Sequence, residues 1–180
     1  AQTKQFIKQG DGGKIVNIAS LASKRPSPLL AHYAASKFAV LGFSKSLALE
    51  VAKHKINVNC ICPGPINTGM TAASPDDAKA TYARRRVPLR RYGEPEEVAH
   101  MTLSLCLPAA SFVHGVAVPV DGDAEPERDD AAGEIHGQVP VVPAQLFVVT
   151  DAVVECPLRG RHVDAVAEVL SHLRLAPKRI

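Results

Sequence analysis

Two short apolar segments on either side of one long segment without proline restrict the fold more than any other feature of the chain. The segments KIVNIAS (14–20) and INVNCIC (56–62) are apolar and rich in β-branched residues, which predicts two strands. Residues 31–53 are rich in alanine, leucine and lysine, with apolar residues at spacings of three and four, which predicts a long helix. A strand, a helix and a strand in succession, with continuously apolar strands, favour parallel pairing in a sheet covered on both faces.

The flanking segments extend this pattern. Residues 2–9 predict the end of a helix, and GDGG after them predicts a stop and a turn. A further helix begins near Pro95, where EPEE places acidic residues in its first turn, and GVAVPVDG (115–122) predicts a last short strand. We therefore expect an α/β fold with a Rossmann-like, doubly wound parallel sheet. Such sheets bind ligands beyond the carboxyl ends of their strands.

Composition is that of a globular chain. The 180 residues, 46% apolar and 22% charged, suffice for one ordinary domain. No apolar run reaches the ~18–20 residues of a membrane helix, and the first ten residues lack the apolar core of a secretory signal. A net charge of +3 is too small to indicate nucleic acid binding. The arginines at 84–86, 90 and 91 lack interleaved aromatic residues, so we interpret them as a solvated loop or a substrate-side rim, with a phosphate patch as the alternative.

The cysteines indicate no metal framework. Cys60 and Cys62 alternate along a predicted strand and therefore point to the same face, with no cluster of histidines or cysteines nearby in the sequence. We interpret them as small apolar core residues. A reduced, cytoplasmic setting fits this use of cysteine best.

Charge divides the chain at about residue 122. Residues 1–122 hold 15 basic and 8 acidic residues, a net charge of +7, whereas residues 123–180 hold 6 and 10, a net charge of −4. The boundary, DGDAEPERDDAAGE (121–134), reads as a solvated linker. We expect 1–122 to be one unit and 123–180 to be a linker and a tail of different character.

Three polar residues share one predicted location. Ser20 ends a strand, and Tyr33 and Lys37 lie one turn apart at the start of the long helix. A serine hydroxyl can hydrogen-bond the oxygen of a carbonyl or an alcohol. The phenol of a free tyrosine, with a pKa of about 10, needs a neighbouring positive charge to act as an acid or base near neutral pH, and a lysine supplies that charge.

The motifs around these residues resemble the classical short-chain dehydrogenase/reductase family. The serine stands thirteen residues before the tyrosine, as in that family, and five segments occur in the family's order. The resemblance covers about residues 5–122. Its segments are GGKIVNIAS, YAASK, INVNCICPGPINT, RYGEPEEVA and GVAVPVDG.

The resemblance implies a hydride transfer between NAD or NADP and a carbonyl/alcohol pair. Tyr33 would be the general acid/base, and Ser20 would orient and polarise the reacting oxygen. Lys37 would favour the phenolate and hydrogen-bond the nicotinamide ribose. The substrate would be a small carbonyl or secondary alcohol, such as a polyol, a sugar or an acetoin-like compound, with an acyl-carrier-linked oxoester also open.

The segment after the second strand would complete the cofactor site. By the same resemblance, Pro63 and Gly64 would turn the chain beneath the nicotinamide, and Ile66 and Thr68 would hold its carboxamide. Residues 65–91 would form the variable substrate loop. The helix at 31–53 would build a homodimer or homotetramer.

Each of these residues also has a simpler interpretation. Ser20 could be a strand-ending hydroxyl, Lys37 a solvated helix residue, Gly64 a turn former and Thr68 a helix N-cap. His32, beside the tyrosine, is a candidate base, but an exposed residue of the first helical turn is the better interpretation. A serine hydrolase using Ser20 is disfavoured because no G-x-S-x-G elbow surrounds it.

The chain departs from the family pattern in two ways. The family's glycine-rich dinucleotide turn, the residue that selects NAD or NADP, and an upstream catalytic asparagine all precede the part that this chain resembles. We therefore expect 1–122 to correspond to the C-terminal half of such an enzyme, truncated at its N-terminus, and a non-catalytic remnant or interaction protein is the alternative. The tail, 123–180, resembles nothing we recognise, and either an appended module or a shifted reading frame at about codon 123 would explain it.

Overall fold

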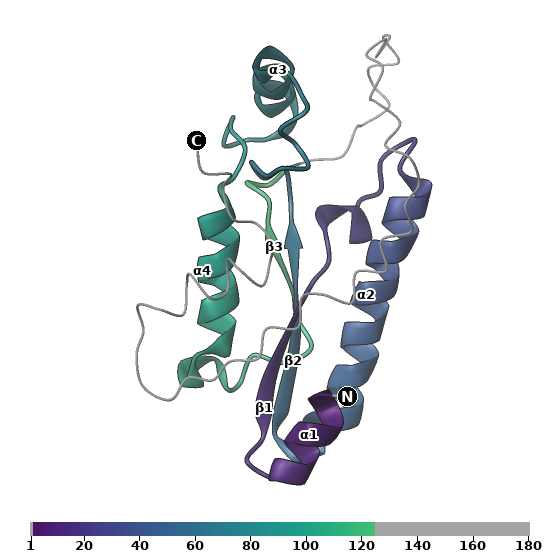
Figure 1. Ribbon diagram of the computed structural model, residues 1–180, viewed down its shortest axis with the longest axis vertical. Coiled ribbons are helices and arrows are strands. Elements are labelled where there is room, and N and C mark those ends of the chain that lie inside the picture. Colours follow the sequence, from purple (N-terminus) through teal and green to yellow (C-terminus); the bar gives the residue numbers. More distant parts are fainter. Residues whose placement is uncertain (1, 125–180) are drawn as a thin grey trace.

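The computed structural model describes residues 2–124, and these form a three-layered α/β unit (Figure 1). The order of elements alternates strands and helices as the sequence predicts. The elements are α1 (Gln2–Gln9), β1 (Gly13–Ile18), the 3-10 turn η1 (Leu21–Ser23), α2 (Ala31–Val51), the 3-10 turn η2 (Ala52–His54), β2 (Ile56–Pro63), α3 (Asp76–Arg86), α4 (Pro95–Cys106), the 3-10 turn η3 (Pro108–Ala110) and β3 (Ala117–Val120).

The three strands form one parallel sheet in the order β1-β2-β3. β1 pairs with β2 from Gly13 opposite Ile56 to Ile18 opposite Ile61, and β3 pairs with the second half of β2. This confirms the predicted Rossmann-like sheet. Both outer strands are shorter than the sequence predicts: β1 ends at Ile18, before Ser20, and β3 covers only 117–120 of the predicted 115–122.

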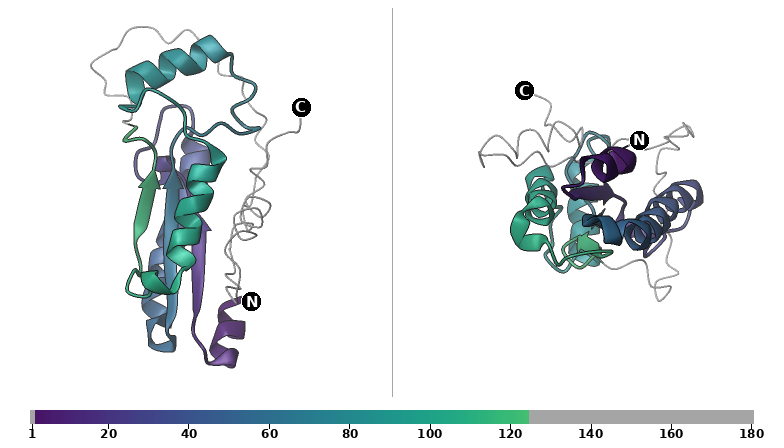
Figure 2. Two further views of the ribbon diagram at one scale, coloured as in Figure 1. Left: turned by 90° about the vertical axis from the view of Figure 1, so that its left-hand side faces the viewer. Right: turned by 90° about the horizontal axis from the view of Figure 1, so that it is seen from below.

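Helices cover both faces of the sheet, as a doubly wound fold requires. α2 lies along one face and α4 along the other (Figures 1 and 2). Each helix closes an apolar core of its own. The core on the α4 face is Val16, Ile61, Ile66, Val98, Ala99, Leu105 and Cys106, and the α2 face holds Ile15, Ala48, Val51, Ile56 and Val58 with Ala19, Cys60 and Cys62.

The turn around Gly12 shows why glycine stands between α1 and β1. Gly12 has φ +79°, and a Cβ on it would lie 2.5 Å from the carbonyl oxygen of Lys55. Lys55, itself left-handed at φ 58°, ends η2 and sends the chain into β2. The long helix therefore ends at Val51, two residues earlier than the predicted 53, and its last predicted residues form the tighter η2 turn.

The described residues extend two positions beyond the boundary that we predict at residue 122. The backbone continues past β3 to Ala124, whose carbonyl accepts a hydrogen bond of 3.0 Å from Arg25. The rest of the predicted tail, 125–180, lies outside the described residues. Within the described part of the chain, no helix combines the length and the apolar character that a membrane crossing requires.

Candidate active site

Ser20 lies directly beyond β1, at the carboxyl end of the sheet. It is 8% exposed, and its Oγ accepts a hydrogen bond of 3.1 Å from the N–H of Ala22. The side chain therefore caps the η1 turn. Because a hydroxyl has one proton and two lone pairs, this capping leaves the proton of Ser20 available for another acceptor. The strand-ending role and a role in binding a substrate oxygen are thus compatible.

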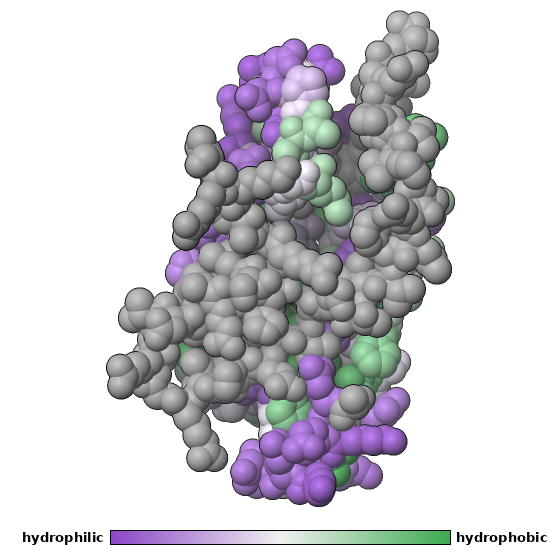
Figure 3. Space-filling view, viewed as in Figure 1, coloured by the Kyte–Doolittle hydropathy of each residue, from purple (hydrophilic) through white to green (hydrophobic). Residues whose placement is uncertain are grey.

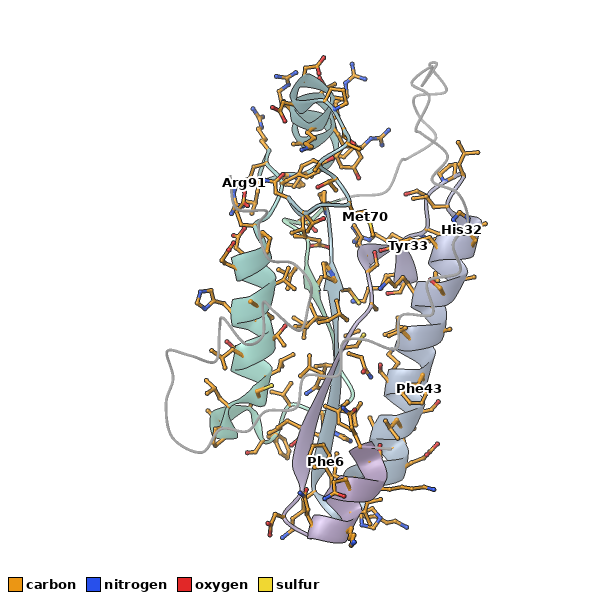
Figure 4. The ribbon with its side chains drawn as sticks, in the orientation of Figure 1. Phe6, His32, Tyr33, Phe43, Met70 and Arg91 are labelled. Atoms are coloured by element: carbon orange, nitrogen blue, oxygen red, sulfur yellow. The ribbon has the colours of Figure 1, made fainter. Side chains whose placement is uncertain are left out.

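Tyr33 and Lys37 lie on the face of α2 that is turned toward β1. The Lys37 Nζ lies 5.8 Å from the centroid of the Tyr33 ring and donates a hydrogen bond of 3.3 Å to the carbonyl of Ile18, the last residue of β1. Since Ser20 follows Ile18 by two residues, the three predicted residues come together at one end of the sheet. Figure 4 shows Tyr33 in the first turn of α2.

Tyr33 and Lys37 are less exposed than His32, the residue beside Tyr33. Lys37 is 8% exposed, so its interpretation as a solvated helix residue is wrong, and burial lowers its pKa, with the thiols of Cys60 and Cys62 opposing that effect. Tyr33 is half-buried, and no described residue hydrogen-bonds its hydroxyl. His32 is exposed, which agrees with its simpler interpretation (Figure 4).

Gly64 packs directly against the end of the neighbouring strand. Pro63 is the last residue of β2, and the N–H of Gly64 continues the ladder with a 3.0 Å hydrogen bond to Val120. A Cβ on Gly64 would lie 2.6 Å from the Cβ and 2.7 Å from the Cα of Asp121. Close approach, and not a positive φ, is what requires glycine here. The turn itself comes later, in residues 69–73.

The loop after Gly64 is hydrogen-bonded to the residues just before α4, but two of its polar groups have no partner among the described residues. The carbonyl of Pro65 accepts a 2.9 Å hydrogen bond from Gly93, and Asn67 donates 2.7 Å to the side chain of Glu94, both just before α4. By contrast, the N–H of Ile66 and the hydroxyl of Thr68 have no hydrogen-bond partner among the described residues. A donor and a hydroxyl of this kind suit a carboxamide, which both accepts and donates. Thr68 caps no helix.

A pocket of about 240 Å³ opens beside this loop. The loop forms one wall and the end of β3 another. Two of its lining residues, Arg91 and Glu97, form a bidentate ion pair with both N–O distances 2.7 Å. The lining residues are Pro65, Ile66, Leu89, Arg91, Gly93, Glu97, Pro119, Val120, Asp121 and Gly122.

Of the arginine cluster, residues 84–86 lie on a helix and not on the solvated loop that we expected, whereas Arg90 and Arg91 lie in the loop that follows it. α3 lies across the carboxyl end of the sheet (Figures 1 and 2), with Asp76 and Asp77 in its first turn and Arg84, Arg85 and Arg86 in its last. This charge order stabilises a helix through its dipole, which explains the correction. Of α3, only Ala83 is buried, and Figure 3 shows hydrophilic residues gathered over it.

Sequence reasoning missed three neighbours of the predicted site. Ser23 and Cys62 are fully buried behind Ser20, and Asp121 lies against Gly64. The prediction that Cys60 and Cys62 share a face of the core is confirmed. In the described residues, no group of three or more histidine, cysteine or acidic side chains is arranged to hold a metal ion.

The comparisons with known proteins agree with this geometry. A family model described as enoyl-(acyl carrier protein) reductase matches residues 1–123. An uncharacterized oxidoreductase, YohF of Escherichia coli, is 40% identical over 119 residues, which are 66% of this chain and 47% of that protein. The 2-dehydro-3-deoxy-D-gluconate 5-dehydrogenase of Dickeya dadantii is 42% identical over 120 residues, with the same coverage.

Solved structures of oxidoreductases match the fold as well. The 3-oxoacyl-[acyl-carrier protein] reductase of Brucella melitensis has a TM-score of 0.63 at 39% identity, over 68% of this chain and 45% of that one. The chain belongs to the short-chain dehydrogenase/reductase family. It spans about half the length of the curated relatives it matches.

Proposed function

We propose that this chain carries the catalytic residues of an oxidoreductase that transfers a hydride between NAD or NADP and a carbonyl or secondary alcohol. The observation that carries the proposal is the meeting of Ser20, Tyr33 and Lys37 at the carboxyl end of a parallel sheet. That is the edge at which open α/β sheets bind ligands. Family membership supports the same reaction class.

Each of the three side chains would have a separate role at the substrate oxygen. In reduction, Ser20 donates a hydrogen bond to the carbonyl oxygen, and the hydroxyl of Tyr33 gives that oxygen its proton. The ammonium of Lys37 stabilises the phenolate that remains. In oxidation the same groups act in reverse, with Tyr33 taking the proton of the alcohol. The bound nicotinamide supplies or accepts the hydride.

Six residues would hold the nicotinamide half of the cofactor. Pro63 and Gly64 would form the floor, and the unpartnered N–H of Ile66 and hydroxyl of Thr68 would bind the carboxamide. Lys37 would reach the ribose, beside Tyr33. Similar proteins have been solved with either cofactor. An L-sorbose reductase complexed with NADPH is 33% identical to this chain, and a 4-hydroxyisoleucine dehydrogenase complexed with NADH is 32% identical.

The substrate would be a small polyol, sugar or acetoin-like compound. Similar proteins include an acetoin dehydrogenase of Salmonella typhimurium, 36% identical with a TM-score of 0.58, and the dehydrogenase of a sugar acid. Residues 65–91, including α3, would form the substrate loop. We infer further that residues 1–122 are one half of the catalytic domain and that 123–180 are a separate linker and tail.

Replacing Tyr33 tests the mechanism. Tyr33→Phe should lower turnover about 10²–10⁴-fold, because it removes the proton that general acid catalysis delivers. Turnover is followed as NADH or NADPH consumption with acetoin, L-sorbose and related carbonyl compounds. Tyr92→Phe removes a hydroxyl outside the proposed substrate loop and serves as the control. Turnover of Tyr33→Phe equal to that of the control would refute the role of Tyr33.

A second candidate is a non-catalytic remnant or interaction protein of the same family. A fluorescence titration with NADH and NADPH separates the two, because the chain contains no tryptophan to interfere. Saturable binding that Thr68→Val weakens supports the oxidoreductase. A folded chain that binds neither cofactor supports the remnant.

We propose that α2 also forms a homodimer or homotetramer interface. Its inner face packs on the sheet, yet its outer face exposes Phe38, Phe43 and Leu49, which are 45%, 60% and 84% exposed. Gly42, between them, has open space where a side chain would be (Figure 4 labels Phe43). Phe43→Asp should shift the protein toward monomer in sedimentation velocity. Leu29→Asp, 89% exposed but outside α2, should not.

A further inference from the structure

A buried thiol and a buried hydroxyl lie directly behind Ser20. Cys62 and Ser23 both have no exposed surface. The Ser23 Oγ lies 3.5 Å from the Cys62 Sγ and also donates a hydrogen bond to the carbonyl of Ser20. The same carbonyl accepts a 3.0 Å hydrogen bond from the N–H of Ser23. The Ser20 carbonyl is therefore held by two donors of one residue, one of which also touches a thiol.

The number of protons gives this chain of contacts a direction. A serine hydroxyl has a single proton to donate. Since Ser23 gives its proton to the Ser20 carbonyl, the thiol of Cys62 is left as the donor to Ser23. The hydrogen bonds thus run from the thiol of Cys62 to the hydroxyl of Ser23, and from that hydroxyl to the carbonyl of Ser20. Cys60, two residues earlier on the same strand face, lies 3.8 Å from the carbonyl of Ile61 and hydrogen-bonds the thiol of Cys62, but it makes no hydrogen bond to Ser23 among the described residues.

We propose that Cys62 and Ser23 are positioning residues for Ser20, coupled so that the ionisation state of Cys62 decides where the Ser23 proton points. While Cys62 is a thiol, Ser23 holds the Ser20 carbonyl. When Cys62 gives its proton to solvent, its thiolate is the stronger acceptor and takes the Ser23 hydrogen bond. The Ser20 carbonyl then keeps only the N–H of Ser23. The consequence for catalysis rests on the proposed function.

The groups around the sulfur favour Cys62 as the thiol that ionises. Hydrogen bonds from Cys60 and Ser23 lower the pKa of Cys62, as does the charge of Lys24 just after η1, while burial acts against them. The ammonium of Lys37, on α2, faces both thiols and lies beside the ring of Tyr33. The pKa of Cys60 is raised, first by its hydrogen bond to Cys62.

Nuclear magnetic resonance of the whole 180-residue chain tests the coupling without cofactor or substrate. Carbon-13 labels at the cysteine Cβ and the serine carbonyl report the ionisation of Cys62 and the hydrogen bonding of Ser20 between about pH 5 and pH 10. We expect the Ser20 carbonyl signal to shift with the same midpoint as Cys62. Cys62→Ser keeps a donor that does not ionise and should abolish the Ser20 step. Cys60→Ser, the same substitution two residues away, should retain it.

Ser23→Ala completes the test. It should remove the Ser20 step and raise the midpoint of Cys62 by about one pH unit, the effect of losing one hydrogen bond to a charged group. A Cys62 that ionises without moving the Ser20 signal, or that stays protonated throughout, would overturn the proposal. Absence of turnover or cofactor binding would instead count against the proposed function, since this readout depends on neither.

Discussion

The two faces of the sheet are built differently. On the α4 face, the core cluster is apolar, with Val98 fully buried, and the buried polar side chain of Thr102 beside it is uncharged. On the α2 face, apolar residues share the interior with Lys37, Ser44 and Asn17, all less than 9% exposed. Both faces bury polar groups that hydrogen bonds make tolerable, but among the described residues only the α2 face buries a charged one, Lys37.

The polar groups of the α2 face are all satisfied. The Asn17 side chain donates 2.9 Å to the hydroxyl of Ser44, which in turn donates 2.7 Å to the carbonyl of Val40. No buried side-chain nitrogen or oxygen among the described residues lacks a partner. The proposed chemistry lies on the face that also buries a charged side chain, and we expect the α4 face to contribute more to stability. The predictions below separate these two contributions.

The largest change in stability is expected on the α4 face. Ile61→Ala should lower the free energy of unfolding by about 3 kcal/mol, because it removes buried methylenes from the centre of β2 and leaves a cavity. Urea unfolding followed by circular dichroism measures this loss. Ile7→Ala makes the same substitution on α1, where the side chain is 40% exposed, and should cost much less. Equal losses at both positions would contradict the assignment of the stability core.

The elements of this architecture could be predicted because they depend on local patterns. The strands at 14–20 and 56–62 are short apolar runs, and the helix between them has helical spacing and no proline. The positions of Ser20, Tyr33 and Lys37 followed, because the ends of parallel strands meet at one edge. The sequence pattern was therefore enough to place these residues at one edge of the sheet, without knowledge of the distances between them.

The rest of the site depends on contacts between residues distant in sequence. The need for glycine at 64 comes from Asp121 on another strand, and no local signal reports that approach. Ser23 occupies a turn where a hydroxyl is unremarkable until Cys62 is placed behind it. The burial of Lys37, too, is set by β1 and β2 and not by its own helix.

A smaller effect is expected at the start of α4, which holds the loop of the proposed cofactor site. Glu97→Ala should lower the free energy of unfolding by about 1 kcal/mol at pH 7, because Glu97 pairs with Arg91 and accepts a 2.8 Å hydrogen bond from the N–H of Glu94. Glu96→Ala, in the same helical turn without these contacts, is the matched control.

The effect of Glu97 should depend on pH in a defined direction. The hydrogen bond and charge of Arg91 lower the pKa of Glu97 from 4.5 to about 2. A lowered carboxyl pKa stabilises the folded state fully above pH 4.5, and the contribution disappears as the pH falls toward 2. The difference between wild type and Glu97→Ala, measured by urea unfolding at a series of pH values, should shrink over that range. A constant difference would show that the ion pair contributes nothing.

The smallest change in stability, with a large change in binding, is expected for Lys37→Met. Methionine fills a similar volume without a buried charge, so the free energy of unfolding at pH 7 should stay within about 1 kcal/mol of wild type and not fall below it. Binding of NADH or NADPH should weaken, since the ammonium that would reach the ribose is gone. Urea unfolding and the fluorescence titration measure the two effects separately.

The difference in stability between wild type and Lys37→Met should change with pH in a defined direction. Because burial lowers the pKa of Lys37 from 10.5, the folded chain holds fewer protons than the unfolded chain between that lowered value and 10.5. The stability of wild type relative to Lys37→Met should therefore rise with pH through that window, as the buried charge is neutralised and its desolvation cost is relieved. A wild type that loses stability relative to Lys37→Met over the same range would mean that the ammonium stabilises the fold. The α2 face would then contribute to stability through its charge, and the contrast between the two faces would fail at its central residue.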